Sequence, residues 1–319
     1  MASIGKQVGL VLNTFIPQRR TPDPRHAIPE SDKNLSGKTI VFTGGTDGMG
    51  RVAVEMLCNM GARVVLLGRN EAKGAAVARD IGSAEGRGVV EFQSCNLASM
   101  ASVRACAERV LTGHSRIDVL VNCAGANVPE RIVTEEGFET NWAINYLGPF
   151  LLTTLLLERL KSSAPGRIVN VSSETEALGH IDFDDLQMEH GFSTLRAYPQ
   201  AKLALNAMTI DLARRLDGTG VTVNCLNPGF ISSNLLRDMQ GVQGLFRYVM
   251  RVFASPPEVG ADRIVRLAVS SEYQDVTGTY VSEDAIAAPN PEAQDPALQE
   301  KLLQVSDSAT AVWRSHRAS

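Results

Sequence analysis

Short apolar runs alternate with longer runs of helical periodicity along most of this 319-residue chain. Strand-length apolar runs occupy residues 39–43, 63–67, 89–94, 119–122, 167–172, 221–227 and 278–281. Helical patterns fill the intervals, most clearly at residues 50–60, 99–111, 137–160 and 198–216. Apolar strands that are each joined to the next by a helix indicate a parallel sheet buried on both faces. The alternation predicts a doubly wound α/β fold with a seven-stranded parallel sheet and right-handed crossovers.

The boundaries of this predicted domain follow from composition. A proline-rich connector at residues 21–29 precedes the first strand, which predicts an N-terminal extension at residues 1–34 and a single domain at residues 35–284. Residues 285–319 form a predicted C-terminal extension, in which residues 297–306 have the pattern of one last helix.

The alternation stops at residues 230–257, which directly follow the sixth predicted strand. This segment is rich in large apolar side chains: Leu235, Leu236, Met239, Leu245, Phe246, Tyr248, Val249, Met250, Val252 and Phe253. Because open α/β sheets bind ligands beyond the carboxyl ends of their strands, we predict a partly helical lid over an apolar substrate pocket. An ordinary core helix or an oligomer contact is the alternative.

Charge and cysteine usage exclude several classes of function. A formal net charge of −4 and the lack of a basic stripe argue against nucleic-acid binding. The five cysteines, an odd number without a C-x-x-C pair, are expected to be reduced thiols, as in a cytoplasmic protein. The five histidines show no metal-ligand spacing, so no metal site is expected.

The N-terminal extension carries an apolar stretch at residues 4–16, followed by Arg19 and Arg20. This stretch is too short to span a bilayer, which takes about 20 apolar residues. It is interpreted as an amphipathic arm that packs on the protein or on a partner subunit. The alternative is an anchor that makes a peripheral membrane contact.

A glycine-rich turn joins the first predicted strand to the following helix. Such a turn lets backbone N–H groups approach a pyrophosphate, whose charge the N-terminus of the helix stabilises. Its place between a strand and a helix predicts a dinucleotide site rather than an ordinary tight turn. The predicted contacts come from Gly44, Thr46, Asp47, Gly48, Met49 and Gly50.

The second predicted strand ends in Gly68-Arg69-Asn70, where an NAD-specific site would place an acidic residue against the ribose. No acidic residue is present there. The guanidinium of Arg69 can pair with the 2′-phosphate of NADP instead, so we predict NADP(H) as cofactor. The alternative is that Arg69 is an ordinary surface arginine.

Three side chains near the fifth strand predict proton chemistry. Ser173 ends that strand, and Tyr198 and Lys202 lie one helical turn apart further along the chain. Hydride transfer to a carbonyl needs a proton donor, and a nearby ammonium would favour the phenolate of Tyr198. Ser173 would hydrogen-bond the substrate oxygen. Pro199 biases Tyr198 away from helical dihedral angles and predicts that Tyr198 stands at the helix entrance.

With these motifs in hand, residues 35–306 resemble the short-chain dehydrogenases/reductases, and most closely their retinol-dehydrogenase-like branch. The resemblance implies a Rossmann-type domain and a catalytic tetrad of Asn145, Ser173, Tyr198 and Lys202. Asn145 would support a water relay to the lysine, and Tyr198 and Lys202 would also touch the cofactor.

The same resemblance implies further cofactor contacts from strand ends. They are Asn96 and Leu97 beside the adenine, Asn122, Ala124 and Gly125 after the fourth strand, and Pro228, Gly229 and Ile231 beside the nicotinamide. Three residues depart from the family pattern: Asn96 stands where aspartate is usual, Cys123 replaces the second asparagine of the N-N-A-G motif, and Pro199 directly follows the tyrosine.

Together these features predict an NADP(H)-dependent oxidoreductase that interconverts a carbonyl and an alcohol. The lipophilic substrate would be a retinoid, a steroid, a polyketide or a fatty aldehyde. The alternatives are a reductase of conjugated C=C bonds and a non-catalytic NADP(H)-binding module. The resemblance also suggests a homodimer or homotetramer that assembles through the helices at residues 137–160 and 198–216.

Overall fold

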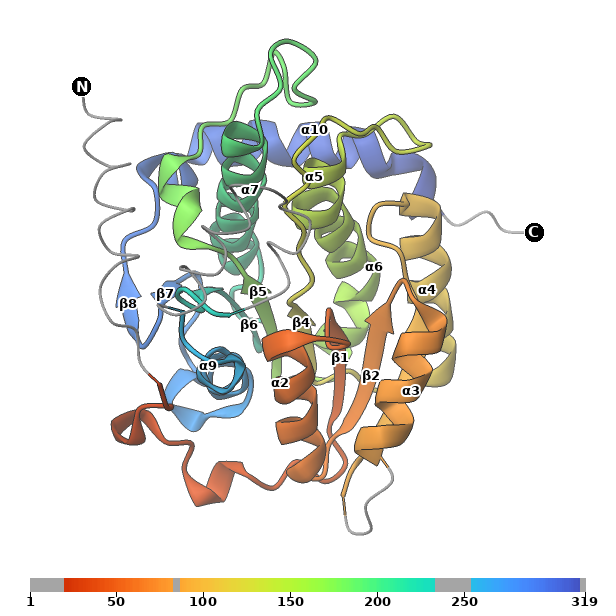
Figure 1. The fold of residues 1–319 in the computed structure, drawn as a ribbon, viewed down its shortest axis with the longest axis vertical. Coiled ribbons are helices and arrows are strands. Elements are labelled where there is room, and N and C mark those ends of the chain that lie inside the picture. Colours follow the sequence, from red (N-terminus) through yellow and green to blue (C-terminus); the bar gives the residue numbers. More distant parts are fainter. Residues whose placement is uncertain (1–19, 83–86, 233–253, 316–319) are drawn as a thin grey trace.

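One eight-stranded sheet runs through the computed structural model, which describes residues 20–82, 87–232 and 254–315 (Figure 1). The spatial order β3-β2-β1-β4-β5-β6-β7-β8 is doubly wound, because the chain returns to the centre of the sheet after β3. The strands are β1 Thr39–Thr43, β2 Arg63–Gly68, β3 Val89–Ser94, β4 Val119–Asn122, β5 Gly166–Val171, β6 Val221–Asn227, β7 Tyr280–Ser282 and β8 Ala285–Ala287. The predicted fold class is therefore confirmed.

The predicted count of seven strands is one too few. All seven strands from β1 to β7 pair in parallel, as predicted. The eighth strand, β8, pairs with β7 at the edge of the sheet and is antiparallel to it. β8 has only three residues, all of them exposed, so it carries no apolar signal in the sequence. A tight connection through Glu283, whose φ is 57°, turns the chain back onto β7.

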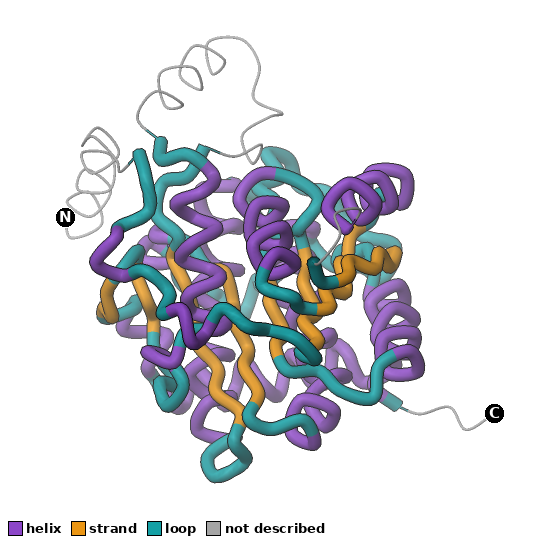
Figure 2. Tube along the Cα trace, turned by 90° about the horizontal axis from the view of Figure 1, so that it is seen from below, coloured by secondary structure: helices purple, strands orange, loops and turns teal. Residues whose placement is uncertain are grey.

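Helices cover both faces of the sheet (Figure 2). One face packs against α2 Gly48–Asn59, α3 Glu71–Gly82 and α9 Pro257–Val269, and its core contains Phe42 and Leu66. The other face packs against α4 Met100–Gly113, α6 Gly148–Ser162 and α7 Thr194–Arg215. The short α5 Thr140–Trp142 leads through a π-helix, Ala143–Leu147, into α6.

Helix α7 begins earlier than its sequence pattern predicts. It starts at Thr194, so Tyr198 stands in its second turn and not at its entrance, and Pro199 lies inside the helix. Pro199 can donate no hydrogen bond to the carbonyl of Leu195. Leu195 is 80% exposed at the start of the helix, where water can satisfy that carbonyl. The proline therefore breaks one bond close to the helix end and leaves the rest of α7 intact.

The last helix, α10 Pro296–Arg314, is longer than the predicted residues 297–306 and lies across α4, α6 and α7 (Figure 1). Its Ser306 Oγ lies 2.6 Å from the buried hydroxyl of Tyr146, and Trp313 stacks edge-on against Phe138. The two helices that were expected to carry an oligomer contact are thus packed against the chain's own C-terminal segment. Sequence periodicity gave no sign of this, because it does not report which element covers a face.

Two predicted features lie wholly or largely outside the described residues: the arm at residues 4–16, and most of the lid at residues 230–257. Of the helices in the described ranges, none has both the length and the apolar character that crossing a bilayer requires.

Candidate active site

The predicted site residues converge on one edge of the sheet. Parallel strands end on the same side, so the segments that follow β1, β4, β5 and β6 meet there. The neighbours β1 and β4 mark the point where the strand order reverses, which is where doubly wound sheets bind ligands. The structure therefore brings together the glycine-rich turn, the segment after Asn122, Ser173 and the turn that begins at Pro228.

The hydroxyl of Thr43 fastens the glycine-rich turn to the end of β4. Its Oγ1 accepts hydrogen bonds from the backbone N–H groups of Cys123 at 3.0 Å and Ala124 at 3.1 Å. Gly44 follows with φ +79°, and a Cβ there would lie 2.6 Å from the Cα of Ala124. Glycine is required at this position both by the dihedral angle and by the close approach. Thr43 was not among the predicted site residues, although its place at a strand end could have indicated it.

The N-terminus of α2 presents an open surface that fits a pyrophosphate. Asp47 caps the helix by accepting from the N–H of Gly48 at 2.8 Å. A Cβ on Gly48 would meet no protein atom within 4 Å, so a phosphate can approach the backbone on that side. The second carboxylate oxygen of Asp47 pairs with Lys73 Nζ at 2.7 Å. Lys73 is a cation near the cofactor turn that the sequence analysis missed.

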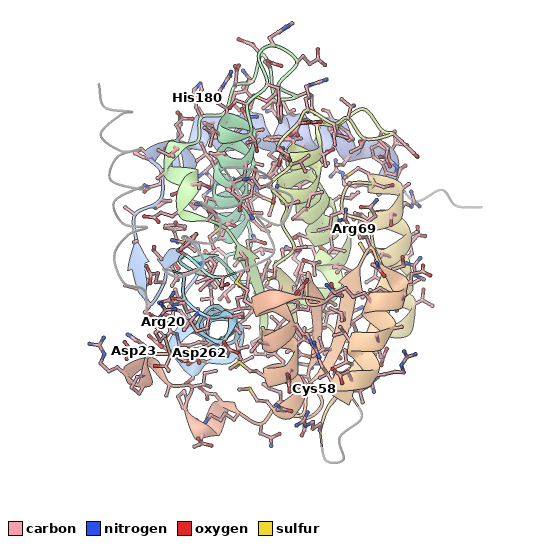
Figure 3. The ribbon with its side chains drawn as sticks, in the orientation of Figure 1. Arg20, Asp23, Cys58, Arg69, His180 and Asp262 are labelled. Carbon is pink, nitrogen blue, oxygen red and sulfur yellow. The ribbon has the colours of Figure 1, made fainter. Side chains whose placement is uncertain are left out.

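Arg69 follows β2 at the same edge of the sheet and is exposed (Figure 3). Beside it, Asn96 follows β3, and its Oδ1 accepts from the N–H of Ala98 at 3.1 Å. Leu97 is buried, with an exposed fraction of 7%. These positions suit the adenosine end of a dinucleotide, as the resemblance implies.

Ser173, Tyr198 and Lys202 meet beyond the end of β5. Ser173, the residue that caps the short 3-10 helix η4 Glu174–Leu178, lies near the Tyr198 side chain and acts to lower the pKa of that phenol. Lys202 Nζ donates to the backbone carbonyl of Val171 at 2.9 Å and lies 5.6 Å from the centroid of the Tyr198 ring. The spacing of these three residues in the sequence thus corresponds to a cluster in space.

Asn145 joins this cluster from the π-helix before α6. Its Nδ2 donates to the carbonyls of Ala126 at 2.8 Å and Asn141 at 2.9 Å, and its Oδ1 accepts from the N–H of Ala126 at 3.1 Å. A Cβ on Gly125 would lie 3.0 Å from Asn145 Oδ1 and 3.5 Å from Lys202 Nζ. Asn145 and Lys202 therefore flank the same glycine. Single π-helical turns of this kind are frequent at functional sites.

Burial dominates the acid–base properties of the cluster. It raises the pKa of Tyr198 to about 12, although Ser173 acts in the opposite direction. It lowers the pKa of Lys202 to about 8. The expected lowering of the Tyr198 pKa by the ammonium is not found: burial is the largest cause of its shift, and the opposing effect comes from Ser173. Near neutral pH the phenol is therefore protonated and the lysine is charged.

A buried carboxylate supports the segment that follows Ser173. The two oxygens of Glu176 each accept from the N–H of Asn290 at 3.1 Å, and Asn290 Nδ2 donates to the carbonyls of Glu176 and Gly179. On the outer side, His180 pairs with Glu292 at 2.7 Å (Figure 3). These contacts join residues more than 100 positions apart, so no local pattern predicts them.

Polar side chains also cross the interior of the sheet below the site. Asn122 Nδ2 donates to Asn170 Oδ1 at 2.8 Å, and Asn170 Nδ2 donates to Thr209 Oγ1 at 2.8 Å. This chain of bonds links β4 and β5 to α7. Asn122 thus has a structural partner as well as the cofactor role that the resemblance implies.

The turn after β6 closes the site on the other side. Pro228 and Gly229 follow the strand directly, and Ile231 pairs with Ser255 in a parallel bridge. The backbone bonds of this bridge run from Ser255 N to Phe230 O and from Ser232 N to Ser255 O, both at 2.8 Å.

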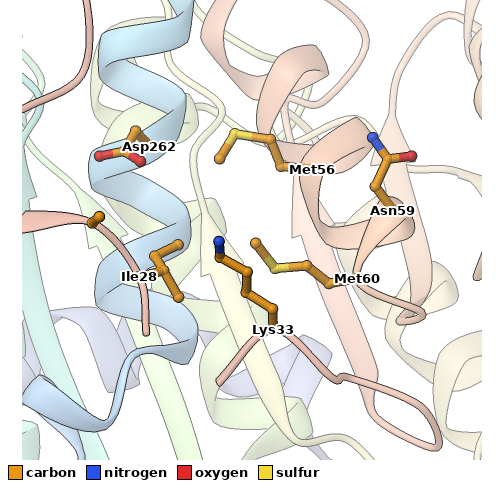
Figure 4. Close-up of a pocket in the computed structure, with 7 residues that line it drawn as sticks. Ile28, Lys33, Met56, Asn59, Met60 and Asp262 are labelled. Carbon is orange, nitrogen blue, oxygen red and sulfur yellow. The ribbon is translucent and has the colours of Figure 1, made fainter. Parts of the chain in front are cut away.

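A separate hollow of about 440 Å³ lies between α2 and α9 (Figure 4). Met56 and Met60 face Ile28 and Lys33 of the N-terminal extension, and Asp262 of α9 lies across from them. The methionines are at the C-terminal end of α2, so the hollow is remote from the carboxyl edge of the sheet. It contains none of the predicted site residues. In the described ranges no three His, Cys, Asp or Glu side chains are grouped to hold a metal ion.

The chain is similar in sequence and in fold to known dehydrogenases. Residues 38–241 match the family model of the short chain dehydrogenases. Retinol dehydrogenase 13 of Homo sapiens is 38% identical over 85% of this chain and 84% of its own length. Retinol dehydrogenase 14 of Homo sapiens is 37% identical over 96% of this chain and 95% of its own length. A Pseudomonas aeruginosa structure, RhlG in an active-site complex with NADP, is 25% identical with a TM-score of 0.66, over 81% of this chain and 98% of that chain.

Replacing Thr43 tests the junction between the glycine-rich turn and β4. The variant Thr43→Val keeps the shape of the side chain but leaves two partly buried N–H groups without an acceptor, which should lower the free energy of unfolding by about 1–3 kcal/mol. Thr43→Ser keeps the hydroxyl and is the control. Urea unfolding measures both, and a Thr43→Val variant as stable as the wild type would show that the bonds contribute nothing.

Proposed function

The chain belongs to the short-chain dehydrogenase/reductase family, in its retinol-dehydrogenase-like branch, and from this premise we propose that it is an NADP(H)-dependent oxidoreductase interconverting a carbonyl and an alcohol. The observation that carries the proposal is the cluster of Ser173, Tyr198, Lys202 and Asn145 at the sheet edge that also holds the glycine-rich turn.

The residues present fit a nicotinamide dinucleotide. The N-terminus of α2 would bind the pyrophosphate, Arg69 and Lys73 would face the 2′-phosphate, and the segment from Pro228 to Ile231 would border the nicotinamide. When bound there, NADP(H) supplies or accepts the hydride. The named NADP complex of a structural relative supports this choice, as does the lack of an acidic residue in Gly68-Arg69-Asn70 at the end of β2.

The chain's own residues would handle the proton. In the direction of reduction, Tyr198 Oη donates its proton to the substrate oxygen as negative charge develops there. The hydroxyl of Ser173 donates a hydrogen bond to the same oxygen. The Lys202 ammonium then stabilises the phenolate that remains. Asn145 orients the chain segment beside Lys202 through its bonds to Ala126.

We propose a lipophilic substrate of the retinoid, steroid, polyketide or fatty aldehyde class. Two observations support it: the apolar composition of residues 230–257, and the retinol dehydrogenases among the relatives. We further propose a cytoplasmic protein in which the apolar residues 4–16 pack on the protein or on a partner subunit; a peripheral membrane contact is the alternative. We propose a homodimer or homotetramer that assembles through α6 and α7, on the parts of these helices that α10 does not cover.

The variant Tyr198→Phe tests the proposed chemistry. Loss of the proton donor should reduce kcat/KM for carbonyl reduction by about 10²- to 10⁴-fold and leave NADPH binding unchanged. The assay follows NADPH consumption with a panel that includes a retinal, a steroid ketone and a long-chain aldehyde. A wild-type protein that binds NADPH but reduces none of them would refute the proposed function.

Replacing Arg69 tests the preference for NADP(H). Arg69→Ala removes a charge-assisted contact with the 2′-phosphate and should raise KM for NADPH by about tenfold, with little change for NADH. Arg79→Ala is the charge-matched control, because Arg79 lies in the last turn of α3, which runs back from this edge of the sheet. An equal rise in KM for NADPH and for NADH would mean that Arg69 does not bind the 2′-phosphate.

The pH dependence of reduction should follow Lys202. Burial lowers its pKa to about 8, so the ammonium that stabilises the phenolate is present below that value and lost above it. We expect kcat/KM for reduction to fall as the pH rises through about 8. Lys202→Arg, which stays charged, should be slower but should not show that fall. A wild-type profile that is flat through this range would exclude the assigned role.

A further inference from the structure

Several side-chain and backbone hydrogen bonds hold the turn that follows β6. Gly229, with φ +78°, donates its N–H to Asn227 Oδ1 at 3.1 Å. Asn227 also accepts at its carbonyl from Glu283 N at 2.8 Å, and its Nδ2 donates to Ser282 Oγ at 3.1 Å. These bonds join the turn to the connection between β7 and β8.

A buried arginine of α9 reaches the centre of this turn. Arg263 Nη1 donates to the carbonyl of Pro228 at 2.7 Å, and the arginine side chain is only 2% exposed. A Cβ on Gly229 would lie 2.9 Å from the same Nη1 and 3.1 Å from Glu283 Cγ. The backbone of the turn therefore rests directly on the guanidinium, and any other residue at position 229 would push it away.

Two carboxylates fix the orientation of the guanidinium. Arg263 Nη2 pairs with Glu283 at 2.9 Å and with Asp284 at 2.8 Å, and Arg266 pairs with Asp284 from one helical turn further along. Arg263 Nε also donates to Asp284, at 3.3 Å, so the planar guanidinium has one orientation, in which Nη1 points at the carbonyl of Pro228. Glu283 adopts its left-handed φ of 57° within this network, an uncommon conformation for a residue with a side chain.

Helix α9, which carries Arg263, also contacts the glycine-rich turn, where we propose that the pyrophosphate binds. A Cβ on Gly260 would lie 2.9 Å from Met49 Sδ of the glycine-rich turn and 3.0 Å from Cγ1 of Ile231. Helix α9 thus contacts both the predicted pyrophosphate site and the predicted nicotinamide site. Arg263 is the side chain through which it holds the second of these.

We propose that Arg263 is a positioning residue: by holding the Pro228 carbonyl, it sets the backbone against which the nicotinamide end of the cofactor rests. The inference builds on the proposed function. It assigns no contact between Arg263 and the cofactor itself, since the guanidinium lies beneath the turn. It predicts that loss of this contact disturbs the nicotinamide end and leaves the adenosine end unchanged.

The test compares binding of NADPH with binding of 2′,5′-ADP, which carries only the adenosine end. In Arg263→Met, the dissociation constant for NADPH should rise about tenfold, while that for 2′,5′-ADP changes less than about twofold. Arg266→Met is the matched control, because it removes a buried arginine from the same network but does not touch the turn. It should lower the unfolding midpoint without this selective loss, and Arg263→Lys should recover part of the NADPH affinity.

Unchanged NADPH affinity in Arg263→Met, or an equal loss for both ligands, would overturn the inference. If Arg263→Met does not fold, Glu283→Gln serves instead, because its side chain is 44% exposed and its loss loosens the guanidinium from one side. The same selective pattern is then expected, with a smaller size. Because the readout is binding, this test does not depend on activity. A wild-type protein that binds NADPH but reduces no carbonyl would refute the proposed function, and the binding constants of the variants would still decide this inference.

Discussion

The hydrogen bond from Lys202 Nζ to the carbonyl of Val171 ties α7 to the last residue of β5. An ammonium buried this deeply needs such a partner, and the bond holds the helix at the height where Tyr198 reaches Ser173. The cluster depends on this attachment, because Ser173 belongs to the strand side and Tyr198 to the helix side. The same burial lowers the pKa of Lys202 and raises that of Tyr198, so the position of α7 also sets the protonation of both groups.

The two sides of the site are built differently. On the side of Tyr198, a long helix packs against a strand end, and the segment after Ser173 is held by Glu176 and Asn290. On the side of Pro228, where we propose that the nicotinamide binds, a short turn is held by a buried ion network centred on Arg263. The glycine-rich turn lies between them and is fastened to β4 through Thr43. Each side therefore has its own support, and each can be weakened without the other.

The fold and the clustering of Ser173, Tyr198 and Lys202 could be predicted because both leave local signals. A strand, a glycine-rich turn and a helix follow one another in sequence, and Tyr198 and Lys202 lie on one face of one helix. Contacts between distant segments leave no such signal, so Arg263, Asn290 and the packing of α10 were missed. The exposed edge strand β8 was missed because it buries no apolar face. Pro199 misled the prediction for α7, since its cost is small near an exposed helix start.

The destination of the hydride tests the central claim most directly. The protein would be incubated with NADPH deuterated at the transferred position and a conjugated lipophilic aldehyde, and the deuterium in the product located by NMR. If Tyr198 protonates a carbonyl oxygen, as we propose, the deuterium will be found on the carbinol carbon. Deuterium on an alkene carbon, or no transfer by a protein that binds NADPH, would contradict the account.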